Sequence, residues 1–220
     1  MPTQAWAWRP ALSPFPQLRY LCYLLFLPSW GLLAPGRRAA IIGTMDLFEA
    51  IAKRYSYRGP FAENPVPRED LLRIVEAGVR APSAKNEQTT SLVIVDDPAI
   101  LARIAAMLDR PVCDTARAVI ACVIDPRPVL PGLSFAVEDC AAAVENMLLA
   151  VTALGYATVW LDGVLRRDQI AERIGRLLGV PEDRSVRVLL PLGVPLVPGR
   201  QREKLPVQQR AWFNRYGGES

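Results

Sequence analysis

Histidine is absent from this sequence of 220 residues. Its absence excludes serine and cysteine hydrolases whose catalytic triads use histidine, most zinc sites, and the commonest general base near neutral pH. Any chemistry must therefore depend on carboxylates, lysine, cysteine or a bound cofactor.

Cysteine is scarce, with four residues and no Cys-x-x-Cys spacing. Most of the four lie in apolar surroundings, where cysteine acts as a small hydrophobic side chain. This usage is typical of a reducing compartment, so we expect a cytoplasmic location. The four residues are Cys22, Cys113, Cys122 and Cys140.

A dense block of basic residues is also lacking, although the formal net charge is +4. We therefore expect no nucleic-acid partner, while an anionic small ligand remains compatible with this charge. With 51% hydrophobic residues, the chain is long and apolar enough for one globular domain with a buried core.

An apolar run near the N-terminus, residues 20–34, is interrupted by Pro28 and is shorter than the roughly 20 residues of a spanning helix. We expect no membrane attachment. A signal peptide is an alternative because Arg19 precedes the run, but the basic pair Arg37–Arg38 follows it.

Residues 1–44 show no amphipathic period, and a regular pattern begins only beyond them. We interpret residues 1–44 as an N-terminal extension without a fold, upstream of a true start at Met45. Residues 45–220 would then form the single domain. If translation starts at Met1, a membrane-attached protein remains the alternative.

Helical and strand patterns alternate through the domain and predict an α+β fold with a small central sheet. A long, almost wholly apolar helix that ends at Gly155 is typical of the centre of a protein or of a dimer. The first helix places Leu47, Phe48 and Ile51 on one face. The first helix is expected to begin just after Thr44. The other expected helices cover residues 68–80, 99–108, 135–155 and 167–179, and the expected strands cover residues 91–97, 118–125, 156–161 and 185–195.

Two basic motifs are compatible with one phosphate group. In "RYSYR", Arg54, Ser56 and Arg58 occupy alternate positions, so in an extended segment their side chains point the same way. Guanidinium groups and a hydroxyl on one side suit a phosphate. "GRQR" repeats the spacing at Arg200 and Arg202. Either motif could equally be a solvated basic turn.

Two further stretches carry uncharged hydrogen-bonding groups. "APSAKNEQ" offers Ser83, Asn86 and Gln88, which match a planar heterocycle such as the pyrimidine edge of a flavin. It could also be an ordinary polar connection between a helix and a strand. "WLDG", residues 160–163, follows a strand, and its backbone amides could hold a reduced ring nitrogen or an oxyanion, or simply form a turn.

The order of these motifs resembles that of the FMN-dependent nitroreductase family, from Met45 to the C-terminus. The resemblance implies an α+β, intertwined homodimer with a small mixed or antiparallel sheet flanked by helices, and with two FMN sites at the interface. It implies that one chain holds the phosphate and the ring near N5, while the "APSAKNEQ" loop comes from the partner subunit. The implied cofactor-binding residues are Arg54, Ser56, Arg58, Arg200, Arg202, Leu161, Asp162 and Gly163, with Pro82, Ser83, Ala84, Asn86 and Gln88 in the loop.

The resemblance further implies hydride transfer from NAD(P)H, bound transiently, through flavin N5 to a nitroaromatic, a quinone or a similar small acceptor. No protein acid or base and no metal is then required, and no G-x-G-x-x-G fingerprint is present. Family members commonly follow the glutamine with proline and an aromatic residue, where this chain has Thr89, Thr90 and Ser91. A protein that binds, stores or senses FMN without turnover is therefore the alternative.

We predict that a chain beginning at Met45 is as soluble, flavin-loaded and thermally stable as the full chain, because residues 1–44 carry neither periodicity nor a motif. Melting temperatures of the two chains test this. A loss of several degrees or more on truncation, the usual scale for a change of about 1–2 kcal/mol in such a domain, would contradict it.

Overall fold

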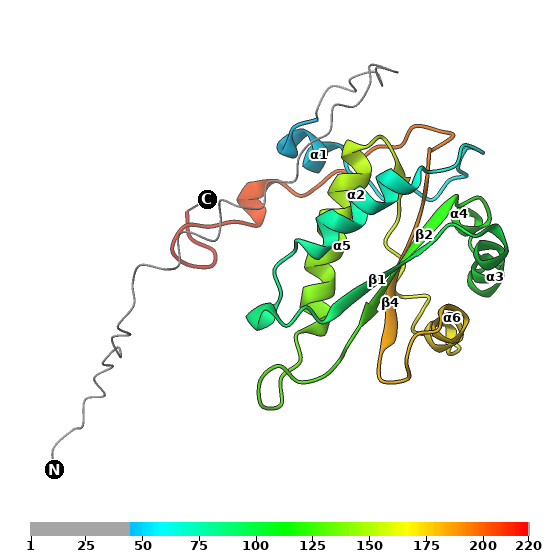
Figure 1. The fold of residues 1–220 in the computed structure, drawn as a ribbon. Coiled ribbons are helices and arrows are strands. Elements are labelled where there is room, and N and C mark those ends of the chain that lie inside the picture. Colours follow the sequence, from blue (N-terminus) through cyan, green and yellow to red (C-terminus); the bar gives the residue numbers. More distant parts are fainter. Residues whose placement is uncertain (1–44, 220) are drawn as a thin grey trace, which may run out of the picture. The chain divides into compact units, whose positions relative to one another are not determined.

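The computed structural model describes residues 45–219, whose elements are labelled in Figure 1. The extension 1–44, with Cys22 and Thr44, lies outside the described residues. Helix α1, Leu47–Lys53, is capped by Asp46, whose carboxylate accepts a hydrogen bond from the Glu49 N–H at 3.0 Å. Within residues 45–219, no helix has the length and apolar character needed to cross a bilayer.

A four-stranded sheet with the order β1-β2-β4-β3 forms the centre of the fold, and all its pairs are antiparallel. Strand β2 is buried along its whole length, because it pairs with β1 on one side and β4 on the other. Strand β1 was expected to be buried but lies at the edge, where only Val95 is fully buried. The strands are β1 Thr90–Val95, β2 Ala118–Ile124, β3 Ala157–Thr158 and β4 Ser185–Gly193.

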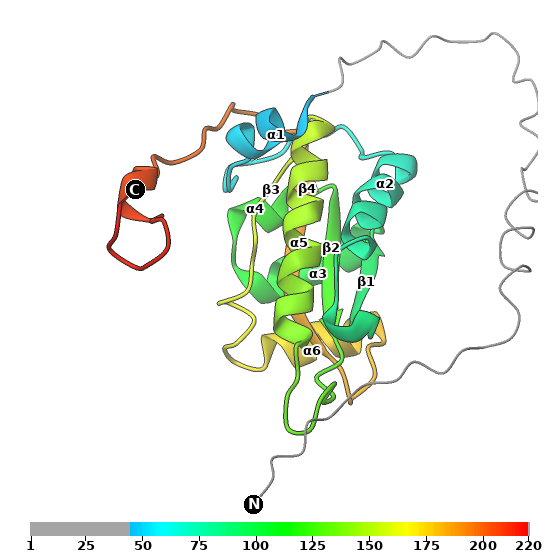
Figure 2. The same ribbon diagram turned by 90° about the vertical axis from the view of Figure 1, so that its left-hand side faces the viewer.

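Helices cover both faces of this sheet (Figures 1 and 2). Helices α2, Arg68–Val79, and α5, Ala136–Ala153, pack on one face, while α3, Pro98–Leu108, and α6, Ile170–Leu178, pack on the other. A short helix α4, Pro111–Asp114, follows α3. The α+β fold with a small sheet flanked by helices is thus confirmed, and the sheet is antiparallel rather than mixed.

Several helix boundaries follow the local signals in the sequence. The Asp97 carboxylate caps α3 by accepting from two backbone N–H groups at 2.8 and 3.1 Å, with Pro98 as the first helical residue. Helix α5 ends at Ala153, and Gly155 adopts the left-handed φ of 80° that stops it. Pro82 follows the end of α2, as expected.

Strand β3 is much shorter than the expected strand 156–161. The pairing of Thr158 with Leu192 places Val159 opposite Pro191, which has no N–H to donate to the ladder. The Pro191 carbonyl instead accepts a hydrogen bond from the Thr158 hydroxyl at 2.7 Å. Pairing resumes only at Leu161, which bridges Leu189.

The apolar face of α1 is exposed in the single chain. Leu47, Phe48 and Ile51 are 60%, 81% and 45% exposed, and only Ala50 of this helix is buried. The periodicity predicted a helix correctly, but residues 45–219 do not cover that face. Contiguous exposed apolar side chains commonly mark an interface.

We predict that Gly78→Ala destabilises the protein by about 1–3 kcal/mol, because overpacking strains a close-packed core. A β-carbon at Gly78 would lie 2.8 Å from Met147 Cγ and 3.2 Å from Leu92 Cδ1, so helices α2 and α5 would have to separate. Urea unfolding measures the change.

Gly175→Ala in α6 is the matched control. Its β-carbon would meet nothing closer than 3.7 Å, so the better helix propensity of alanine should stabilise the protein by up to about 1 kcal/mol. Equal effects of the two substitutions would show that the close contact at Gly78 does not limit stability.

Candidate functional site

A cationic cleft gathers both basic motifs of the sequence. Its volume is ≈ 650 Å³, and Arg54, Ser56 and Arg58 line it together with the late segment around Gln201. The segments are 142 or more residues apart in the sequence, so the fold alone brings them together. The full lining is Arg54, Tyr55, Ser56, Arg58, Arg200, Gln201, Arg202 and Lys204.

The side of this cleft that is formed by residues 54–58 pairs with β3. Beyond α1 the chain is extended, and Ser56 forms a parallel bridge with Thr158. The Tyr57 N–H donates to the Thr158 carbonyl at 2.8 Å, and the Tyr57 ring is buried in the core. Ser56 and Arg58 therefore face the cleft as the alternation predicted, although Tyr55 also lines it.

The other side of the cleft, around Gln201, is hydrogen-bonded to the C-terminal end of α1. Gln201 Nε2 donates to the carbonyls of Ile51 and Arg54 at 3.2 and 3.0 Å. Gly199 lies against the Tyr55 ring, where a β-carbon would approach Cε2 to 2.1 Å. A glycine is thus required for this segment to reach the cleft.

The cleft is strongly positive. Five of its eight lining residues are arginine or lysine, and none is acidic. Within residues 45–219, one ion pair involves a lining residue of the cleft: Glu145 Oε1 lies 3.9 Å from Arg54 Nε. Guanidinium forks with a hydroxyl and an amide suit a phosphate ester, so the donor set fits the phosphate end of FMN.

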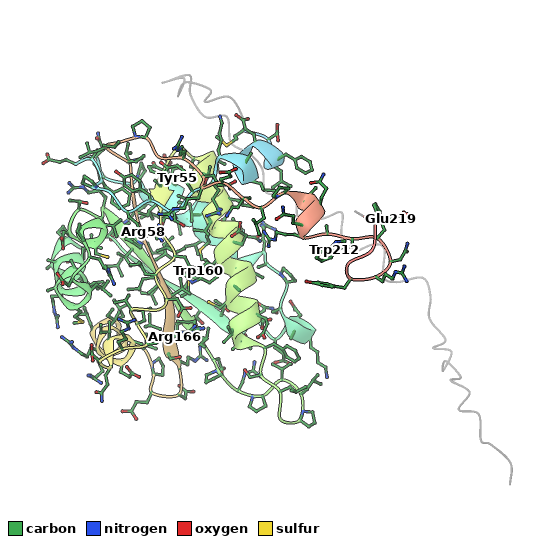
Figure 3. All side chains as sticks on the ribbon, turned by 180° about the vertical axis from the view of Figure 1, so that it is seen from behind. Tyr55, Arg58, Trp160, Arg166, Trp212 and Glu219 are labelled. Atoms are coloured by element: carbon green, nitrogen blue, oxygen red, sulfur yellow. The ribbon has the colours of Figure 1, made fainter. Side chains whose placement is uncertain are left out.

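A second pocket of ≈ 330 Å³ adjoins the cleft and shares Arg58 with it. In Figure 3, Tyr55, Arg58, Trp160 and Arg166 follow one another down one side of the molecule. The turn after β3 forms one wall of the pocket, and the segment between α3 and α4 forms the other. The pocket is lined by Arg58, Arg110, Pro111, Val112, Trp160, Leu161, Asp162, Gly163 and Val164.

The turn Asp162–Gly163 offers its backbone to this pocket. The Asp162 carboxylate is already bound by Arg166 at 2.7 and 2.8 Å and by Arg187 at 3.2 Å. Within residues 45–219, neither the Asp162 nor the Gly163 N–H donates a hydrogen bond. A β-carbon at Gly163 would meet no atom within 4 Å, so neither packing nor a positive φ explains the glycine. The space beside Gly163 is open.

The "APSAKNEQ" loop lies elsewhere in the chain. Pro82, Ser83 and Gln88 line a separate pocket of ≈ 120 Å³ near the start of α5, and Ala84 and Asn86 belong to the same loop. Figures 1 and 2 place this loop and α1 at opposite ends of α5. The loop pocket and the cationic cleft share no lining residue. Along α5, the loop is attached at Asp139, and Arg54 of the cleft lies beside Glu145.

The three cysteines of the described residues lie in the apolar core clusters. Burial, with a smaller effect of Asp114, raises the pKa of Cys113 to about 12. Cys122 and Cys140 are also buried, and all three are free thiols. The expectation that they act as small hydrophobic residues is confirmed for these three. In the part of the chain from 45 to 219, no cluster of three or more cysteine or acidic residues is arranged to hold a metal.

Sequence reasoning missed seven residues that line the two pockets: the polar Tyr55, Arg110, Gln201 and Lys204, and the apolar Pro111, Val112 and Val164. Gln201 and Lys204 flank "GRQR", so the wider segment could have indicated them. Arg110 belongs to no motif, and only the fold brings it opposite Trp160. It also forms no ion pair within the described residues.

Comparison with known proteins gives a consistent family. A family model described as the nitroreductase family matches residues 51–112 and 117–194. A relative from Archaeoglobus fulgidus, named NADH dehydrogenase/NAD(P)H nitroreductase, is 35% identical over 136 residues, which cover 61% of this chain and 78% of the relative. A protein of the same name from Methanothermobacter thermautotrophicus is 34% identical over 161 residues, covering 70% and 80%.

A solved structure agrees with these matches. The NADPH:FMN oxidoreductase from Vibrio harveyi, complexed with NAD+, superposes with a TM-score of 0.68 at 25% identity, covering 79% of each chain. The residues that the family model matches include the first basic motif, the "APSAKNEQ" loop and the "WLDG" turn. The chain belongs to the nitroreductase family.

Proposed function

We propose that the protein is an FMN-dependent oxidoreductase that passes hydride from NAD(P)H to a nitroaromatic, a quinone or a similar small acceptor. The observation that carries this proposal is the junction at Arg58, where the cationic cleft meets the pocket beside the Asp162–Gly163 turn. A phosphate at one end and a planar ring at the other are the two parts of FMN. The names of the relatives support the class of reaction.

The phosphate would be held by the cleft. Arg54, Arg58 and Arg202 would provide the charge and Ser56 a hydroxyl donor, with Arg200 and Lys204 nearby. The planar fork of a guanidinium group matches the oxygens of a phosphate in a bidentate arrangement.

The ring would lie in the adjoining pocket. Leu161, Asp162 and Gly163 line it, and the free N–H groups of the turn would donate to the ring edge near N5. Bound FMN supplies the hydride acceptor and donor at N5, so this chain needs no acid, base or metal of its own. The protein would position the ring, exclude water beside Trp160 and leave one ring face open to donor and acceptor in turn.

The loop would complete the site from a second copy of the chain. Pro82, Ser83 and Gln88 line a pocket that shares no residue with the cleft of their own chain, and Ala84 and Asn86 belong to the same loop. Two observations support a dimer: this separation, and the exposed apolar face of α1 at Leu47, Phe48 and Ile51. In a two-fold dimer, each site would combine the cleft of one chain with the loop of the other.

Replacing Arg58 with alanine should weaken FMN binding by about 1.5–3 kcal/mol, the contribution of a charge-assisted hydrogen bond. Riboflavin, which lacks the phosphate, should lose far less. Fluorescence titration of both ligands measures the difference. Arg103→Ala is the control, since Arg103 is an exposed arginine outside both pockets. Equal losses for FMN and riboflavin would remove Arg58 from the phosphate site.

Turnover separates an enzyme from a flavin store. We expect the purified protein to be yellow, anaerobic NADH or NADPH to bleach the flavin band, and a quinone or nitroaromatic to restore it. Double-reciprocal plots should be parallel, because donor and acceptor alternate at one site. Bound flavin that NAD(P)H does not reduce would instead support a protein that stores or senses FMN.

Mixed dimers test the shared site in the same assay. Arg58→Ala and Asn86→Ala lie on opposite sides of each proposed site, so a dimer with one copy of each variant has one doubly altered site and one intact site. Such dimers should recover up to about half of the wild-type activity, by counting sites in a two-fold assembly. Absence of recovery would place each site within one chain.

A further inference from the structure

The "APSAKNEQ" loop has an unusual backbone. Lys85, Asn86 and Gln88 all adopt left-handed conformations, with φ of 52°, 59° and 51°. Non-glycine residues rarely take this conformation, and each does so at a cost in free energy. Three within four residues therefore persist only if the surrounding structure holds the loop in place.

A single buried carboxylate joins the two ends of this loop. Asp139, in the first turn of α5, is only 6% exposed. Its Oδ1 accepts from the Ala84 N–H at 2.9 Å, and its Oδ2 accepts from the Thr89 hydroxyl at 2.7 Å. The left-handed residues all lie between these two attachment points.

Other contacts support the loop from outside. The Gln88 N–H donates to Ser83 Oγ at 3.0 Å, and Arg127 binds the Glu87 carboxylate at 2.9 Å and donates to its carbonyl at 3.2 Å. These contacts involve residues open to solvent, where such bonds are weaker. Asp139 provides the buried connection between the loop and the rigid helix.

Thr89 has a particular part in this arrangement. It is 3% exposed, and its hydroxyl faces Asp139 rather than solvent. Members of the nitroreductase family commonly have proline after the glutamine. Proline offers no hydroxyl donor. At the position where this chain departs from the family pattern, threonine therefore forms a hydrogen bond within the chain, on the buried side of the loop.

We infer that Asp139 is a positioning residue: through Ala84 and Thr89 it holds the loop in the left-handed conformation that presents Ser83 and Asn86 to the flavin. The inference rests on the proposed function, in which this loop reaches FMN in the partner's cleft. A loop held before binding loses little conformational freedom when the ligand arrives, so it binds more tightly than a flexible one. Asp139 itself does not touch the ligand.

The lysines of the sequence allow a direct test of the loop. The chain has only three, Lys53, Lys85 and Lys204. Endoproteinase Lys-C, which cleaves after lysine, therefore reports loop opening as a cut after Lys85 that divides the full chain near its middle. Lys204 lies in an exposed segment and reports protease activity in every sample. The digestion needs no flavin.

Four variants are compared. Asp139→Ala removes both attachments, whereas Asp139→Asn can still accept from Ala84 and can donate to the Thr89 oxygen. Thr89→Val removes one donor and keeps Asp139, so it remains informative if Asp139→Ala does not fold. Glu138→Gln is the control, because it removes a carboxylate from the same turn but is exposed and contacts no loop residue.

We expect Asp139→Ala to speed the cut after Lys85 by about tenfold or more, since local opening governs cleavage of a folded protein. It should also weaken FMN and riboflavin equally, by about tenfold or more. Thr89→Val should change both measurements in the same direction by less. Asp139→Asn and Glu138→Gln should resemble the wild type. All digestions are run well below the melting temperature of each variant.

Unchanged cleavage after Lys85 in Asp139→Ala and in Thr89→Val would overturn the role of Asp139 in holding the loop. An opened loop with unchanged flavin affinity would overturn its role in binding. A wild-type protein that binds neither flavin would contradict the proposed function instead, and is recognised before any variant is compared. The digestion would still decide whether Asp139 holds the loop.

Discussion

The hydrogen bond from the Tyr57 N–H to the Thr158 carbonyl, 2.8 Å long, is the contact on which the candidate site depends. It fixes the first basic segment against β3, with Ser56 and Arg58 facing the cationic cleft. The turn that lines the second pocket begins two residues after Thr158. Pro191 interrupts the β3–β4 ladder, pairing resumes at Leu161, and the turn beyond it lines the pocket that Arg58 shares with the cleft. One backbone contact therefore sets the spacing between the phosphate end and the ring end of the proposed site.

Helix α5 contacts both parts of the proposed site within one chain. Its first turn carries Asp139, which binds the loop, and its middle carries Glu145, whose Oε1 lies 3.9 Å from Arg54 Nε in the cationic cleft. A helix is stiff, so α5 fixes the positions of the loop and the cleft relative to each other. The two nevertheless line separate pockets. The proposed dimer would combine them, and the apolar face of α1, which is exposed within residues 45–219, is consistent with such pairing.

Most of the fold could be predicted because its signals are local. Asp97–Pro98, Gly155 and the apolar periods need only neighbouring residues to act, and the structure shows helices and strands at these places. The interruption of β3 could not be predicted, since it depends on Pro191 lying opposite Val159 in a register that only the folded sheet defines. The exposure of Phe48 depends likewise on what the rest of the chain covers. At the candidate site, the motifs indicated the basic segments. Arg110 lines the second pocket, and Asp139 binds the loop, only because the fold brings together segments far apart in the sequence.

The lack of histidine is explained by how the proposed site divides the work. Hydride chemistry would belong to the cofactor, and what remains for the chain is to bind, orient and exclude water. Arginine serves the first task better than histidine, because a guanidinium keeps its charge where an imidazole would lose it. Backbone N–H groups at the Asp162–Gly163 turn serve the second, since their direction is fixed by the fold. The side chains that titrate near neutral pH in other enzymes would have no task in such a site, and Asp139 accepts hydrogen bonds from the Ala84 N–H and the Thr89 hydroxyl.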